Sequence, residues 1–314
     1  ASYDAPPEDT GEAVGLSVAG LTITFGFGPT LFRNENGQDR FGILARKPAE
    51  LTDLPHFPAD NLDANFTGGD ICIQACANDP QVAVHAIRNL TRIAFGRAAL
   101  KWSQLGYGRT SSTSESQKTE RNLFGFKDGT ANVKAENTTD VSDFVWTGAD
   151  SAASWMTGGT YLVARRIRMT LETWDRTSLR EQENVIGRTK AEGAPLSGGK
   201  EFSAANFTTT DANGSPLIDK NSHMAQAHPT NNGGAKLLRR GYNFVDGNDA
   251  LGRLNAGLFF ISFQKSPEQF ITIQKTLAKN DTMNEYLKHV GSGIFAIPQG
   301  VQPGSFIGSS LFLA

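Results

Sequence analysis

Cysteine, net charge and long apolar runs are all scarce in this sequence. Its 314 residues include 2 cysteines, and 30 basic against 32 acidic side chains leave a formal net charge of −2. Proteins that bind nucleic acids generally carry a basic excess, so we expect no nucleic-acid partner. No apolar run approaches the roughly 18 residues that a membrane-spanning helix needs. Hydrophobic residues still make up 39% of the chain, which is enough for a buried core.

The two cysteines, Cys72 and Cys76, lie in a segment (residues 69–77) that is typical of a β-strand. Residues four apart on a strand are about 13 Å apart, whereas a disulfide needs Cα atoms within about 7 Å. Two thiols are also too few for a zinc site of the thiolate type. We therefore expect two small, buried thiols that form no disulfide with each other.

A strand–helix–strand unit is predicted twice along the chain. Residues 69–77 lead into a helix that Asp79 caps and Pro80 opens, and residues 257–264 lead into a helix opened by Pro267. A shift of 187 residues aligns the two prolines. Short strands are expected after the helices, at residues 104–107 and 293–297. The match favours an internal duplication over a chance pairing of two common units.

The remaining pattern completes an α+β fold. We expect strands at residues 21–28, 158–169 and 237–244, a helix over 171–188, and mostly loop over 191–232. Strands interleaved with helices, with some neighbouring strands joined directly, indicate duplicated ferredoxin-like halves. The boundary is expected near residues 147–157, which divides the chain into residues 1–150 and 151–314.

Five histidines are candidates for metal or acid–base chemistry. His56 lies between prolines in a loop, His85 lies within a predicted helix, and His289 is expected to cap one. His223 and His228 are five residues apart, which is not the spacing of a helical zinc site, and no Glu separates them. An axial haem ligand needs only one histidine, and composition alone does not choose between these two.

A carboxylate and an arginine pair are the other candidates. Asp128 precedes Gly129, and the dipeptide is typical of a turn; the alternative is a carboxylate at a pocket wall that a cofactor approaches closely. Arg239 and Arg240 are consecutive on a predicted strand, so they point to opposite faces. An inward arginine needs an anionic partner, for which a haem propionate, a bound peroxide or Asp128 would serve. The alternative is a pair of surface arginines.

Three segments together resemble the dye-decolorizing peroxidases in content, order and spacing. They are Phe-Gly-Phe-Lys-Asp-Gly-Thr-Ala-Asn at 124–132, His-Met-Ala-Gln-Ala-His-Pro at 223–229, and Leu-Leu-Arg-Arg-Gly-Tyr at 237–242. Residues 284–286 and 291–298 resemble the bacterial deferrochelatase/peroxidase branch, which is linked to iron uptake. The resemblance covers essentially the whole chain.

The resemblance implies an enzyme, a haem peroxidase that reduces hydrogen peroxide and oxidises dyes or other bulky aromatic donors. Its fold would be of the dimeric α+β barrel type, with heme b in the second half. His223 matches the proximal haem ligand, Asp128 the distal acid and Arg239 the distal arginine.

Two further site residues follow from the same resemblance. Phe260 resembles the aromatic lining of the distal pocket. Asp281 is expected to hydrogen-bond the proximal imidazole, with Glu285 as the rival. Bulky donors would not enter a pocket lined by phenylalanine, so we expect electron transfer through a Trp or Tyr near the surface, with Trp155, Tyr161 and Tyr242 as candidates.

The resemblance also bears on the N-terminus and on partners. The family domain begins with a strand and a helix upstream of residue 1, so the first half is expected to lack both. The first ten residues are polar and acidic and resemble no targeting segment. The branch commonly carries a twin-arginine leader, so we expect export to the cell envelope, periplasm or exterior after its removal, with the cytoplasm as the alternative. A membrane iron-uptake assembly and an oligomer are expected partners.

Two other functions stay open at this point. One is a deferrochelatase or haem-handling protein that releases iron from haem. The other is a non-haem α+β binding module, in which Asp128 is only a turn residue.

Overall fold

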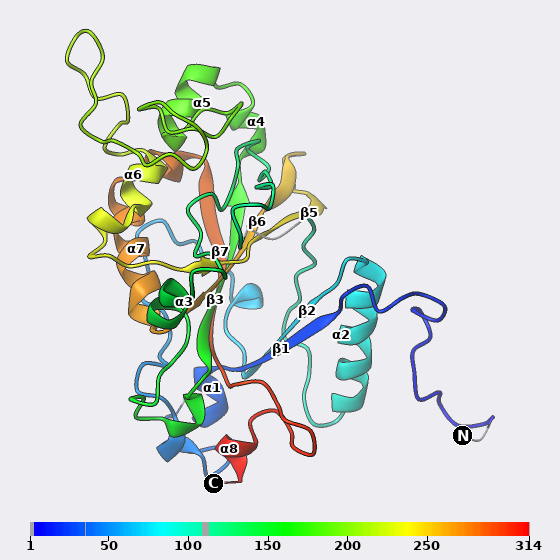
Figure 1. The fold of residues 1–314 in the computed structure, drawn as a ribbon. Helices are drawn as coiled ribbons and strands as arrows, with labels where there is room; N and C mark the ends of the chain where they lie inside the picture. The colour runs from blue at the N-terminus through cyan, green and yellow to red at the C-terminus, as the bar shows by residue number, and fades with distance from the viewer. Residues whose placement is uncertain (1–2, 35, 109–112, 314) are drawn as a thin grey trace.

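One antiparallel, curled sheet organises the protein. The computed structural model describes residues 3–34, 36–108 and 113–313. Within them the strand order is β2-β1-β7-β3-β6-β4, and β5 also pairs with β6 (Figure 1). The strands are β1 (Thr22–Phe27), β2 (Ile71–Cys76), β3 (Thr160–Met169), β4 (Leu238–Arg239), β5 (Tyr242–Asn248), β6 (Leu254–Gln264) and β7 (Leu287–Ile297).

The helices are mostly short and lie around this sheet. They are α1 (Pro29–Phe32), α2 (Pro80–Ala94), α3 (Thr138–Phe144), α4 (Leu171–Trp174), α5 (Leu179–Ile186), α6 (His223–Ala227), α7 (Pro267–Asn280) and α8 (Ser309–Phe312). The expected helix starts are confirmed: the Asp79 side chain caps α2, and Ser266 with Gln269 forms a capping box at α7.

The central strands β7, β3 and β6 present a different core on each face. On one face Val163 and Ile294 pack with Phe270 and Ile273 of α7. On the other, a separate cluster holds Leu162, Ile261 and Phe295 together with Cys72 and Tyr242. Because neighbouring residues of a strand point to opposite faces, alternate side chains along β3, β6 and β7 belong to opposite cores.

The N-terminal hairpin has a slender connection to this centre. Strand β1 pairs with β2 along its whole length, but it pairs with β7 through a single residue pair, Phe27 with Ala296. Helix α2 lies beside this hairpin and away from the central strands (Figure 1). Helix α7 packs on β3 and β6 of the central sheet, and α6 packs on α7.

Three expected elements differ from those observed. Residues 104–107 form no strand, and only Tyr107 makes an isolated bridge, to Asn243. The helix expected over 171–188 is split into α4 and α5, because Ser178 caps a new helix start at the Glu181 amide. The strand expected over 237–244 is interrupted, where Gly241 passes so close to Leu258 that a Cβ would come within 3.2 Å of a methyl carbon.

The expectation that His289 caps a helix was wrong. Strand β7 begins at Leu287 and pairs with β3 along its whole length, which places His289 opposite Ile167 in the sheet. The side chain is only 4% exposed. The cysteines were also expected to be buried; both are free, but each is half-buried.

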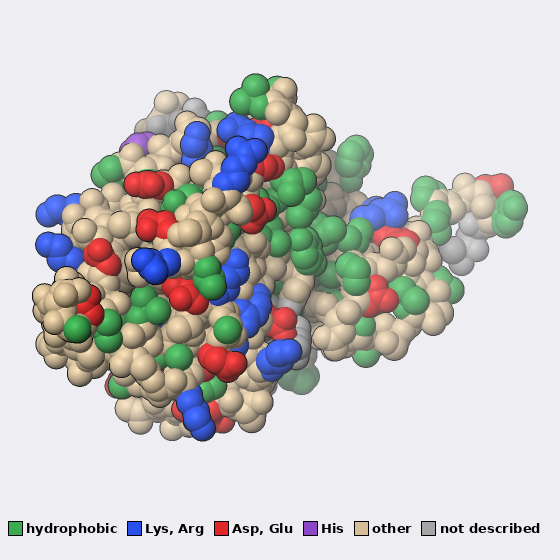
Figure 2. Space-filling view, turned by 90° about the horizontal axis from the view of Figure 1, so that it is seen from above, with side chains coloured by type: hydrophobic (Ala, Val, Ile, Leu, Met, Phe, Trp, Pro, Cys, Tyr) green, Lys and Arg blue, Asp and Glu red, His purple; other side chains and the backbone are tan. Residues whose placement is uncertain are grey.

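Charges of both signs are mixed over the surface. Figure 2 shows Lys and Arg interspersed with Asp and Glu on the face that it presents. In the part of the chain that the structure describes, no helix combines the length and the apolar character needed to cross a membrane.

Candidate active site

His223 is anchored to Asp281 in a way that leaves one ring nitrogen available. It is the first residue of α6, whose N-terminus is capped by the Ser222 side chain. Its Nδ1 lies 2.6 Å from Oδ2 of Asp281, at the end of α7. The other carboxylate oxygen of Asp281 accepts the Met283 amide at 2.9 Å. With Nδ1 held, Nε2 is the nitrogen left to bind a metal.

Electrostatics make His223 a more basic imidazole than usual. Burial lowers its pKa, but the charge of Asp281 and the hydrogen bond to it outweigh this, so the pKa is raised overall. Asp281 is 2% exposed, whereas the His223 side chain keeps 31% of its exposure. A buried carboxylate behind a partly accessible imidazole is the arrangement that increases the donor strength of a metal-binding histidine.

Arg239 and Asp128 form the second pair of the site. The guanidinium of Arg239, at the end of β4, donates to Oδ1 of Asp128 at 2.5 Å. Asn122 donates to the other oxygen of Asp128 at 3.2 Å. Asp128 sits in a turn whose next residue, Gly129, has φ of 104°, a conformation that favours glycine. Of the anionic partners considered for an inward arginine, the structure supplies Asp128.

The two pairs belong to one electrostatic environment. Both Arg239 and Asp128 influence the pKa of His223, the first lowering it and the second raising it. Phe260 of β6 lies beneath Arg239, with the guanidinium carbon 5.6 Å from the ring centroid. The site thus combines an imidazole nitrogen, a carboxylate, a guanidinium and an aromatic wall, which suits metal ligation and proton transfer.

Asn132 is a site residue that sequence reasoning missed. Its side chain accepts the Arg239 backbone amide at 2.7 Å and donates to the Arg239 carbonyl at 3.0 Å. These bonds join the Asp128 turn to β4 and fix the arginine beside the acid. Asn132 ends the first of the three recognised segments, so its place there was the available signal.

Glu201 is a second missed residue, and it holds the Asp128 turn through hydrogen bonds to residues near Asp128. It accepts hydrogen bonds from Lys127 and from Thr130, the latter at 3.1 Å. Burial would raise the pKa of Glu201, but hydrogen bonds from Lys127, Thr119 and Thr130 lower it overall. Lys127 and Thr130 lie on either side of Asp128 in sequence, so Glu201 acts as a clamp on the turn.

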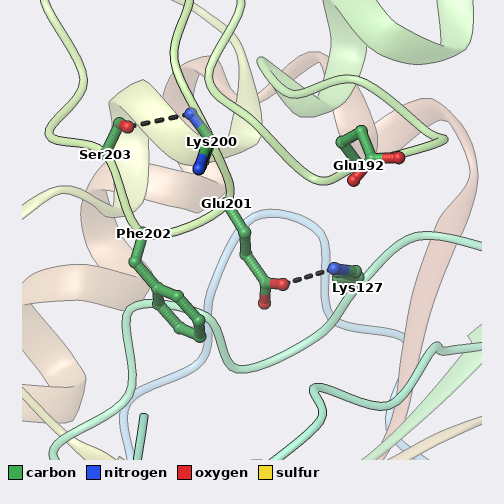
Figure 3. A pocket seen from close by; sticks show the side chains of 6 residues that line it. All are labelled: Lys127, Glu192, Lys200, Glu201, Phe202 and Ser203. Carbon is green, nitrogen blue, oxygen red and sulfur yellow. Dashed lines mark hydrogen bonds and ion pairs between the residues drawn. The ribbon is translucent and has the colours of Figure 1, made fainter. Parts of the chain in front are cut away.

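The cavity beside this clamp is separate from the paired residues. It has a volume of about 560 Å³ and is lined by Lys127, Glu192, Lys200, Glu201, Phe202 and Ser203 (Figure 3). His223 and Arg239 are not part of its lining. The cavity therefore adjoins Lys127 and Glu201 of the clamp and not the side chains of His223 or Arg239.

The other candidates lie elsewhere or have other partners. His228 hydrogen-bonds Thr230 and packs against the ring of Phe207. Glu285 is exposed, and Asp281 makes the hydrogen bond for which the two were rivals. Trp155 and Tyr161 are 5% and 2% exposed, so the expectation that they lie near the surface was wrong.

Comparisons with known proteins agree with this geometry. The family models "Dyp-type peroxidase, N-terminal" and "Dyp-type peroxidase, C-terminal" match residues 1–108 and 119–302. A dye-decolorizing peroxidase of Thermobifida fusca (strain YX) is 37% identical, over 98% of this chain and 72% of the relative. A deferrochelatase of Escherichia coli (strain K12) is 33% identical over the same shares. Ferric DtpA from Streptomyces lividans has a TM-score of 0.89 at 36% identity, covering 98% of this chain and 81% of that one.

Proposed function

The chain belongs to the Dyp-type peroxidase family, and from this premise we propose that it is a haem peroxidase whose site is formed by His223, Asp281, Asp128 and Arg239. Hydrogen peroxide is the oxidant, and a dye or other bulky aromatic compound is the electron donor. The observation that carries the assignment is the presence of two hydrogen-bonded pairs, imidazole with carboxylate and guanidinium with carboxylate, whose charges all influence the pKa of His223.

The residues present fit a haem. Nε2 of His223 has no hydrogen-bond partner among the described residues, and its ring is oriented by a buried acid. The cofactor is proposed to be heme b, held without covalent bonds, because the two cysteines lie in Cys-Ile-Gln-Ala-Cys and not in the pattern that attaches c-type haem. When bound, the haem iron supplies the redox chemistry and an open coordination position for peroxide.

Asp128 and Arg239 act on the peroxide. The Asp128 carboxylate accepts a proton from one oxygen of the peroxide and returns it to the other oxygen, which leaves as water. This proton transfer is worth roughly 10²–10⁴-fold in rate. The Arg239 guanidinium stabilises negative charge that develops as the oxygen–oxygen bond breaks. Asn132 and Glu201 position this pair through the strand and the turn that carry it. Phe260 provides the apolar wall that keeps bulky donors out.

Haem-reconstituted protein tests the assignment of His223. We expect His223→Ala to lose the Soret band and His228→Ala, the matched control five residues away, to keep it. In Asp128→Asn we expect unchanged haem content but a rate of reaction with peroxide lower by about 10²–10⁴-fold. A Soret band that survives His223→Ala would move the ligand elsewhere.

A second candidate function is release of iron from haem, because several relatives are deferrochelatases. In that reaction the porphyrin takes up two protons as the iron leaves. Incubation with haem and analysis of the pigment separates the two functions: metal-free porphyrin supports iron release, and intact haem with peroxide-dependent dye bleaching supports the peroxidase.

We further propose the finer organisation that the resemblance implies. The chain would consist of two ferredoxin-like halves, residues 1–150 and 151–314, with the haem in the second. The protein would work outside the cytoplasm after removal of a twin-arginine-type leader, as an oligomer and in contact with a membrane iron-uptake assembly. Cell fractionation tests the location, sedimentation of the holoprotein tests the oligomer, and co-purification from solubilised membranes tests the assembly.

A further inference from the structure

Tyr242 and Cys76 form a side-chain pair on the face of the sheet opposite the candidate active site. Cys76 ends β2, Tyr242 begins β5, and the sulfur lies 3.2 Å from the phenol oxygen. Tyr242 pairs with Phe259, while Arg239 lies over the next residue of β6, Phe260. Since successive strand residues point to opposite faces, the sheet separates the pair from Arg239.

The pair is held in place from several sides. Gly106 lies against Tyr242 so closely that a Cβ there would come within 2.6 Å of the tyrosine Cβ. Backbone hydrogen bonds of 2.8 and 3.0 Å between Tyr107 and Asn243 fix the adjoining segments. Gln74 also approaches the Cys76 sulfur, at 3.4 Å. Tyr242 and Cys76 thus meet in a preorganised geometry.

The phenol of Tyr242 is protonated, and the residue lies near Arg239 in the sequence. Burial, followed by the hydrogen bond to Cys76, raises the pKa of Tyr242, which keeps it a phenol at neutral pH. Tyr242 follows Arg239 by three residues, and the two residues pair with the same strand, β6. A phenol that loses an electron also releases its proton, and the sulfur beside it is the nearest reactive neighbour.

We propose that the peroxidase reaction joins Cys76 to Tyr242 through a thioether bond between the sulfur and a ring carbon next to the hydroxyl. The inference rests on the proposed function, which supplies the oxidant. The thiol S–H bond and one ring C–H bond break, and one C–S bond forms. The two electrons and two protons released reduce one hydrogen peroxide to two waters, so the step needs no other reactant.

The bond would change both the stability and the redox properties of the protein. It would tie β2 of the N-terminal hairpin to β5, in a region where β1 is joined to β7 by one residue pair. A sulfur substituent also makes a phenol easier to oxidise, so the joined pair would pass electrons from a donor too bulky for the haem pocket.

Mass analysis of the holoprotein tests this inference. Haem-loaded protein receives successive equivalents of peroxide without a donor, and is then reduced with dithiothreitol, alkylated and digested. We expect the chain to lose two hydrogens and the peptides containing Cys76 and Tyr242 to appear as one species. The species should be absent from Tyr242→Phe and Cys76→Ser, and present in Cys72→Ser, the control on the same strand.

The contrary outcomes are distinct. Three results would overturn the cross-link and leave the proposed function standing, provided that the protein consumes peroxide. They are an unchanged mass, the addition of oxygen at Cys76, and a loss of two hydrogens that dithiothreitol reverses. Failure of the parent to consume peroxide would overturn both. Tyr242→Phe retains the ring that packs in this region, so its haem content and melting temperature should match those of the parent before peroxide is added.

Discussion

The hydrogen bond between Asp281 and His223 gives the most specific prediction about the haem site. Asp281→Asn keeps the size of the side chain but removes the buried negative charge 2.6 Å from Nδ1. Burial and Arg239 both lower the pKa of His223, and of the described groups that raise it only Asp128 would remain. The imidazole should therefore become less basic and a weaker ligand to iron.

The expected magnitude follows from the position of this carboxylate behind a metal ligand. Loss of such a partner typically weakens metal binding or activity by about 10–100-fold. We expect haem to dissociate from Asp281→Asn faster by that factor, and the reduction potential of the bound haem to rise. Haem loss is followed as decay of the Soret band in the presence of excess apoglobin, and the potential by spectroelectrochemistry.

A matched control lies four residues away. Glu285 is an exposed carboxylate at the end of the 3-10 turn (Thr282–Glu285) that Asp281 caps, and the carboxylate that hydrogen-bonds the His223 ring is that of Asp281. Glu285→Gln should therefore release haem at the parental rate and leave the potential unchanged. If Asp281→Asn behaved as the parent did while Glu285→Gln lost haem, the reasoning from the observed hydrogen bond would be refuted.

Three other perturbations have defined outcomes. Burial lowers the pKa of His289 from 6.5 to about 4. Between pH 6.5 and pH 4 the unfolded chain therefore binds a proton that the folded chain does not, and the free energy of unfolding falls with pH, by about 3 kcal/mol at most. Urea unfolding of the apoprotein should show a shallower fall with pH for His289→Gln, and the same pH dependence in parent and variant would contradict this. Asn132→Ala should lower the free energy of unfolding by about 1–3 kcal/mol. It should also slow the reaction with peroxide, measured by stopped-flow absorbance, without loss of haem. A reaction as fast as that of the parent would mean that Arg239 is positioned without Asn132. Glu201→Gln should lower the melting temperature and the peroxide rate together, whereas Glu192→Gln, on the same cavity, should change neither.

Local signals in the sequence were sufficient for much of the fold. Alternation of apolar residues located β1, β2, β3 and β6, and the Asp79 and Pro267 signals located the starts of α2 and α7. These features depend on residues that are close in the sequence, so they can be predicted without the tertiary structure. The strand expected at residues 104–107 failed because a strand needs a partner along its length, and there only Tyr107 has one.

The candidate site divides in the same way. The three segments around Asp128, His223 and Arg239 indicated the family through their content, order and spacing, and the chemistry was expected because the resemblance implied it. Only the tertiary structure decided which of these side chains form pairs. Asp281 meets His223 across 58 residues of sequence and Arg239 meets Asp128 across 111. Nothing in a local pattern distinguishes Asp281 from Glu285, because burial and distance, which set the strength of a charge interaction, arise only when α6 packs on α7.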